Sequence, residues 1–142
     1  MKLFLSGNVV SAGNLYRQVV ETMALALLCS SKKFDFMDRF IANRYSTNNA
    51  VNDAIRHATK IGVNKNAVKT LGHIQKFYHP YSHPTVLTII DGMSFSEKGL
   101  CVGAIFDNGK MQSYTKEIRS RVNLAKVFNK FVDGIKSNVA QW

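Results

Sequence analysis

Apolar residues recur at helical spacing along most of the chain. Residues 11–29 show this most clearly, because the stretch is apolar on nearly all sides and its polar residues form one narrow stripe. Ser11 is placed to cap this helix, and so apolar a helix is expected at the centre of its domain. The polar stripe, spaced i, i+3, i+4 and i+7, consists of Asn14, Arg17, Gln18 and Glu21.

Further helical patterns follow at shorter length. Asn64 and Ser46 or Thr47 are suitable caps, Gly62 suits the residue after a helix end, and Pro80 is expected to end or kink a helix. The final helix carries Leu124, Phe128, Phe131, Ile135 and Val139 on one face. The predicted helices cover residues 34–41, 46–61, 64–78, 85–90 and 120–139.

A β pattern appears once. Residues 100–106 and 110–118 flank Asp107-Asn108-Gly109, and an Asn-Gly pair favours a hairpin turn with positive φ. The sequence therefore predicts a mainly α fold: a bundle of four to five helices with one β-hairpin before the C-terminal helix. No linker interrupts the pattern, so residues 1–142 are expected to form a single helical domain.

The composition bears on the cellular location of the protein and on the class of its binding partner. The chain is 46% hydrophobic over 142 residues, enough for a core without disulfide or metal, and Cys29 and Cys101 lie in apolar runs that favour buried, reduced thiols. It shows neither a secretory signal nor the run of about 20 apolar residues that spans a membrane, which makes the cytoplasm the default location. The net charge of +10 favours a polyanion such as RNA or DNA, or an acidic protein partner.

Five lysine and arginine side chains and no acidic one lie between Arg56 and His83. Lys65, Lys69 and Lys76 fall on one face of the predicted helix 64–78 and could contact phosphates. Tyr78 and Tyr81 follow and could stack on unpaired bases. The alternative is a solvated helix face. Residues 110–136 add Lys110, Lys116, Arg119, Arg121, Lys126, Lys130 and Lys136 against only Glu117 and Asp133.

Three histidines lie within residues 73–83, beside tyrosine and serine. Such a helix end can supply a general acid and a general base, and the alternative is a turn whose imidazoles bond to the backbone. His79 and His83 have i, i+4 spacing, but Pro80 disturbs a helical metal-ligand pair, so neither metal nor cofactor is predicted.

Arg17 and Glu21 are also spaced i, i+4, on a helix expected to be buried. Because unpaired buried charges are costly, the two should pair or reach a cavity. One interpretation is a structural ion pair or an exposed helix edge. The other is that Arg17 points into a polar pocket shared with His79 or His83.

Two motifs together resemble those of the HEPN superfamily of helical bundles. Residues 11–21 look like the family's Arg-x-x-x-Glu helix through Arg17 and Glu21, and residues 78–85 look like its "Ser-x-x-His-Pro-Ser" helix end. The resemblance implies a homodimeric bundle that cleaves or binds RNA, often in toxin–antitoxin or phage-defence systems. Catalytic members act without metal, through an Arg shortly before the His. Here Lys76 is the nearest cation before His83, and Arg17 would supply the guanidinium from another helix.

The leading hypothesis is therefore an RNA-directed HEPN-like protein, either a metal-independent ribonuclease or a degenerate RNA binder. His83 and His79 are its candidate acid and base, with Arg17 and Glu21 beside them. The alternatives are a non-enzymatic module that binds an acidic protein through its basic face, and a small-molecule sensor at Arg17. A homodimer is expected, because the final helix is more apolar than the first helix can cover.

Overall fold

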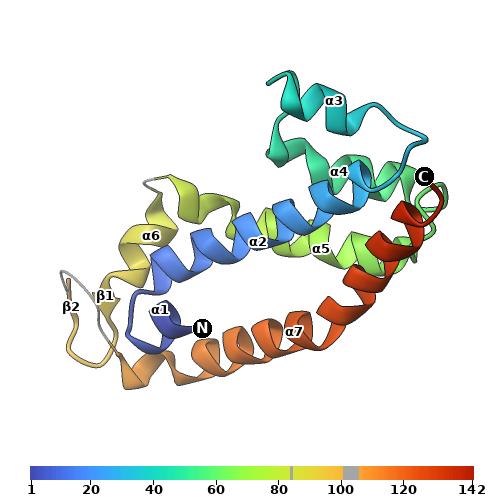
Figure 1. The fold of residues 1–142 in the computed structure, drawn as a ribbon. Helices are drawn as coiled ribbons and strands as arrows, with labels where there is room; N and C mark the ends of the chain where they lie inside the picture. The colour runs from blue at the N-terminus through green and yellow to red at the C-terminus, as the bar shows by residue number, and fades with distance from the viewer. Residues whose placement is uncertain (84, 101–105) are drawn as a thin grey trace. The chain divides into compact units, whose positions relative to one another are not determined.

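A computed structural model describes residues 1–83, 85–100 and 106–142, with only the backbone described at position 87. The protein is mainly helical, with one small antiparallel sheet (Figure 1). Within these residues no helix is both long enough and apolar enough to cross a membrane. The helices are α1 (Lys2–Leu5), α2 (Val9–Cys29), α3 (Phe36–Ile41), α4 (Thr47–His57), α5 (Lys65–Tyr78), α6 (Val86–Asp91) and α7 (Met111–Val139), with 3-10 turns η1 (His79–Ser82) and η2 (Asn108–Lys110).

The contacts divide the chain into two compact units. Unit 1 comprises Met1–Tyr16 and Tyr78–Lys126, and unit 2 comprises Arg17–Phe77 and Val127–Trp142. Helices α2, α5 and α7 each contribute residues to both units. The single domain predicted from the sequence remains a prediction.

Unit 2 contains the larger apolar core. Leu27 and Leu28 of α2 are fully buried with Val51 of α4 and Val68 of α5. Each such side chain contributes about 1.5–3 kcal/mol by leaving water. Helices α4 and α5 also pack closely at Gly72, where an added Cβ would lie only 3.1 Å from the side chain of Ile55. The expectation that the first long helix is central to its core is confirmed for this half of α2.

Two of the helix-end signals in unit 2 are confirmed, at Asn64 and Gly62, whereas Ser46 precedes α4 without a side-chain capping bond. The side chain of Asn64 caps α5, its Oδ1 accepting from the backbone N–H groups of Asn66 at 2.8 Å and Ala67 at 3.3 Å. Gly62 has φ of 69°, a conformation that glycine adopts without strain.

The free thiol of Cys29 is buried, and burial raises its pKa. Cys101 lies outside the described residues.

The predicted hairpin is wrong in its second half. Residues 108–118 form η2 and the first turns of α7, which begins at Met111 instead of Ser120. The reason is Asp107, whose buried carboxylate accepts from the N–H groups of Gly109 at 2.8 Å and Phe95 at 2.5 Å. The bond from Gly109 caps the start of η2, and the bond from Phe95 holds Asp107 in place, so the Asp-Asn-Gly sequence opens a helix and does not close a hairpin. Hydrogen bonds from Ser96 and from the Phe95 backbone lower the pKa of Asp107 to about 2.

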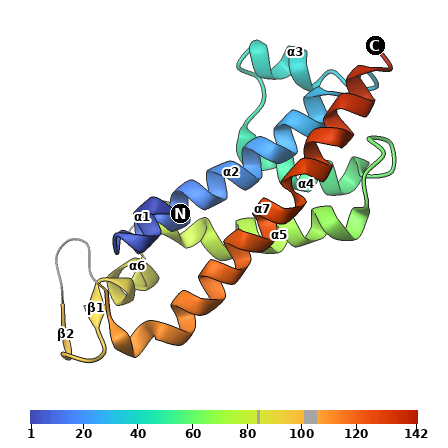
Figure 2. The same ribbon diagram turned by 60° about the horizontal axis from the view of Figure 1, so that its bottom comes forward.

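A short hairpin does precede α7, but it lies earlier in the chain. Strands β1 (Met93–Ser94) and β2 (Gly99–Leu100) pair antiparallel, with Met93 opposite Leu100, and β1 packs beside α6 (Figure 2). Residues 101–105, most of the first predicted strand, lie outside the described residues. The apolar contacts of unit 1 include Phe4, Ala12 and Tyr114, packed by Val9.

The apolar face predicted for the final helix is only partly covered. Leu124 is buried, whereas Phe128 is 47% exposed and Val139 is 44% exposed. In unit 2, α2 and α7 line an apolar hollow of about 160 Å³ formed by Thr22, Met23, Ala26, Phe128, Phe131, Val132 and Ile135. The homodimer inferred from this face stays a prediction.

Candidate nucleic-acid interface

The lysine face of α5 is the clearest candidate site. Lys65, Lys69 and Lys76 are all exposed and lie within about 40° of one another around the helix axis. They extend over about 16 Å of helix, at about 1.5 Å per residue. The buried side of α5 carries Val68, Leu71, Gln75 and Tyr78, so core packing holds the lysine face toward solvent.

The charge of this face is not neutralised. No acidic residue occurs between Asp53 and Asp91, and in the described part of the chain no carboxylate forms an ion pair with the three α5 lysines. Arg56, also counted among the basic residues, pairs with Asp53 at 3.0 Å. The three lysines of this face therefore keep their charge for a partner.

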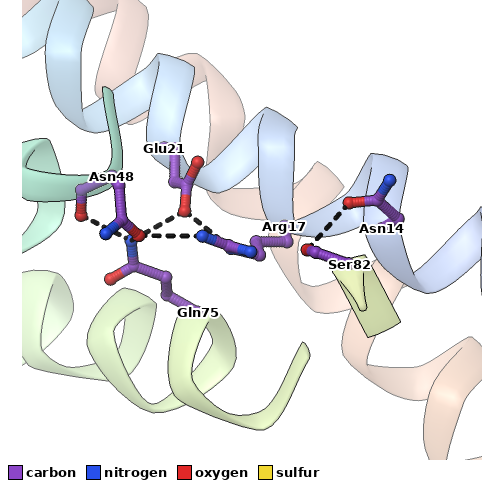
Figure 3. A network of polar contacts seen from close by, with 6 residues as sticks. All are labelled: Asn14, Arg17, Glu21, Asn48, Gln75 and Ser82. Atoms are coloured by element: carbon purple, nitrogen blue, oxygen red, sulfur yellow. Dashed lines mark hydrogen bonds and ion pairs between the residues drawn. The ribbon is translucent and has the colours of Figure 1, made fainter. Parts of the chain in front are cut away.

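The two candidate catalytic histidines lie in unit 1, on the turn that follows α5. His79 and His83 are both exposed, and their ring centroids are 5.6 Å apart. Ser82 anchors the turn to α2, its hydroxyl donating to Asn14 Oδ1 at 3.1 Å (Figure 3). The turn thus presents two imidazoles to solvent at close range. Among the described residues, no group of three His, Cys, Asp or Glu side chains is placed to hold a metal ion.

Arg17 and Glu21 form a buried ion pair in unit 2, with Arg17 Nε 2.8 Å from Glu21 Oε1. Arg17 also donates to Asn48 Oδ1 at 2.8 Å, and Gln75 Nε2 donates to Glu21 Oε1 at 2.8 Å and to the Asn48 carbonyl at 2.9 Å (Figure 3). The expectation that the two charges pair is confirmed. This network links α2 to α4 and α5. The polar pocket that Arg17 was expected to share with His79 or His83 stays a prediction.

Sequence reasoning did not identify Asn48 and Gln75 as members of this network. Gln75 carried a signal, because it falls on the apolar side of α5 between Leu71 and Tyr78. A polar side chain at such a position needs a buried hydrogen-bond partner. Asn48 carried none, since it lies in the first turn of α4 and is exposed over part of its surface.

The two tyrosines proposed to stack on bases are packed inside unit 1. Tyr78 is only 3% exposed, and its hydroxyl donates to Glu117. Tyr81 is half-buried and packs so closely on α2 that a Cβ at Gly13 would lie 2.8 Å from its ring. Burial raises the pKa of both phenols, assisted by Glu117 at Tyr78 and by Asp91 at Tyr81. Tyr78 in particular leaves almost no ring surface for a ligand.

Two cations that the sequence placed among the surface charges are buried. Arg121 pairs with Glu117, and its guanidinium carbon lies 4.6 Å from the ring centroid of Phe4 and 4.9 Å from that of Tyr16. Lys110 donates to the backbone carbonyls of Ile90 at 3.1 Å and Asp91 at 2.8 Å. Neither side chain is available to a phosphate, so the basic surface is narrower than the composition indicates.

Comparison with protein-family models, with curated proteins and with solved structures found no match to this chain. The fold and the candidate site define a basic, mainly helical protein with a lysine-lined helix face. Its function is inferred from its own residues.

Proposed function

We propose that this protein binds RNA through the lysine face of α5. The observation that carries the proposal is the alignment of Lys65, Lys69 and Lys76 on one exposed helix face, where no carboxylate among the described residues pairs with them. Each ammonium can contact a phosphate and release a counterion, which is the main source of affinity for nucleic acids. The net charge of +10 extends this attraction beyond the contact surface.

Replacing all three lysines by alanine should weaken binding to a single-stranded RNA and reduce its salt dependence. The slope of log affinity against log salt is expected to fall by about 2 units, from about 0.7 unit per phosphate contact on a single strand. Fluorescence anisotropy of a labelled oligonucleotide over a salt series measures this change.

The matched control removes the same charge elsewhere. Lys116, Lys126 and Lys130 are exposed on α7, so their triple alanine variant has the same net charge as the α5 variant. An equal loss of slope in both variants would contradict a site on α5. Binding of polyglutamate as tight as that of RNA would instead favour the acidic-protein alternative.

A second candidate function, RNA cleavage, is favoured by the exposed His79–His83 pair with ring centroids 5.6 Å apart. One imidazole would take the proton of a ribose 2′-hydroxyl as that oxygen bonds to the adjacent phosphorus. The other, protonated, would donate to the 5′-oxygen as its bond to phosphorus breaks, leaving a 2′,3′-cyclic phosphate. This is the metal-independent activity that the HEPN resemblance implies.

His83→Ala is expected to reduce cleavage of single-stranded RNA by at least about 100-fold, the usual contribution of a general acid or base. The wild-type rate should not change with chelator. His57→Gln is the control, because His57 lies on α4, outside both the histidine pair and the lysine face. Wild-type protein that leaves RNA intact, or cleavage that chelator abolishes, would exclude this second function without affecting the binding proposal.

A further inference from the structure

Phe77 is a large aromatic side chain on the surface of α5. It is 57% exposed, and it follows Lys76 directly in the same unit as the three lysines. On α5, all of whose residues are described, it is the only large apolar side chain in the exposed class. More than half of this residue's surface is therefore open to solvent, where an apolar side chain gains little from burial.

His73 lies on the same side of the helix as Phe77. The two residues are spaced i, i+4, which places them about 40° apart around the axis and about 6 Å apart along it. His73 is also exposed. The strip that holds these two rings adjoins the lysine face, because Lys69 and Lys76 lie within about 100° of Phe77 around the same axis. Cations and exposed aromatic rings thus share one rigid surface.

We propose that this α5 surface binds single-stranded RNA, with Phe77 stacking on an unpaired base while the lysines hold the backbone phosphates. The inference rests on the proposed function and specifies the class of RNA. Proteins that bind single strands combine a basic track with aromatic side chains on which bases stack. A duplex does not offer this contact, because its bases are already stacked on one another and its major groove is too narrow to enter.

The composition of this surface favours a nucleic acid over a protein partner. Protein interfaces have an apolar core, and one phenylalanine among lysines, His73, Asn66 and Thr70 does not provide one. Unpaired bases need only ring faces and cations, which is what α5 presents. His73 supplies a second ring for a neighbouring base, since histidine also serves as a stacking partner in RNA recognition.

The test compares Phe77→Leu with wild type on a labelled oligouridine and on an RNA duplex. Leucine keeps an apolar side chain but has no ring face. Affinity for the single strand is expected to fall at least about fivefold, the lower end of the contribution of one base stack. Duplex affinity and the salt slope should stay unchanged, because the lysines remain. Phe40→Leu on α3 is the control, since Phe40 is also exposed in unit 2.

The outcomes separate this inference from the proposal on which it rests. Unchanged oligouridine binding by Phe77→Leu, or an equal loss on both RNAs, would overturn the stacking role even if the lysine variant loses affinity. Wild-type protein that binds neither RNA would overturn the proposed function itself. Thermal unfolding of Phe77→Leu should stay close to that of wild type, because leucine keeps an apolar side chain at this position. A loss of affinity then cannot be attributed to a loss of fold.

Discussion

Glu21→Ala is expected to lower the free energy of unfolding by about 3–5 kcal/mol. Glu21 Oε1 accepts from both Arg17 Nε and Gln75 Nε2, each at 2.8 Å, and only 8% of the glutamate side chain is exposed. Its removal takes the carboxylate from a buried ion pair and one of the acceptors from the Gln75 amide. Urea denaturation followed by the helical circular dichroism signal measures the loss.

An exposed pair of the same spacing provides the control for Glu21→Ala. Asp35 and Arg39 are also i, i+4, but they are 3.9 Å apart and their side chains are 70% and 41% exposed. Asp35→Ala should therefore cost less than about 1 kcal/mol. Arg17→Met combined with Glu21→Met should recover part of the loss, because no buried charge is left unpaired. Equal effects of Glu21→Ala and Asp35→Ala would show that the network is not a buried one.

The second large effect is expected in unit 1, where Arg121→Ala should destabilise the protein by about 3–5 kcal/mol. The guanidinium pairs with Glu117 and lies against the rings of Phe4, Tyr16 and Tyr78, at 4.6, 4.9 and 5.7 Å from their centroids. Truncation removes the counterion of a mostly buried carboxylate and opens a space between aromatic rings. Thermal and urea unfolding should both record the loss.

Arg121→Lys distinguishes charge from shape in this cluster. Lysine keeps the positive charge, but a compact ammonium cannot stack on the rings as a planar guanidinium does, so only part of the stability should return. Arg119→Ala is the matched control, because Arg119 is exposed on the same helix, and it should change stability by less than about 0.5 kcal/mol. If Arg121→Ala lowered the free energy of unfolding no more than Arg119→Ala does, Arg121 would be an exposed surface charge and not a buried one.

Much of the helical fold could be predicted from local patterns. The helix predicted over residues 11–29 is α2, and the cap at Asn64 and the end at Tyr78 agree with α5. Apolar period and capping act within one or two turns of chain, so neighbouring residues contain the information. The predicted hairpin was wrong because the contact that decides this segment is not local. Asp107 begins a helix because it also binds the backbone of Phe95, a contact 12 residues away that local turn preference does not include.

For the candidate site, the sequence by itself determined the lysine face, because helix geometry alone aligns Lys65, Lys69 and Lys76. Only the tertiary structure decided which charged and aromatic side chains are buried. Tyr78 and Phe77 are adjacent in sequence and equally suited to stacking, yet one is 3% exposed and the other 57%. Burial depends on partners distant along the chain, as with Tyr16, whose hydroxyl donates to the carbonyl of Ser120, 104 residues away. The fold sets such contacts only when the core closes and each buried polar group must find its partner there.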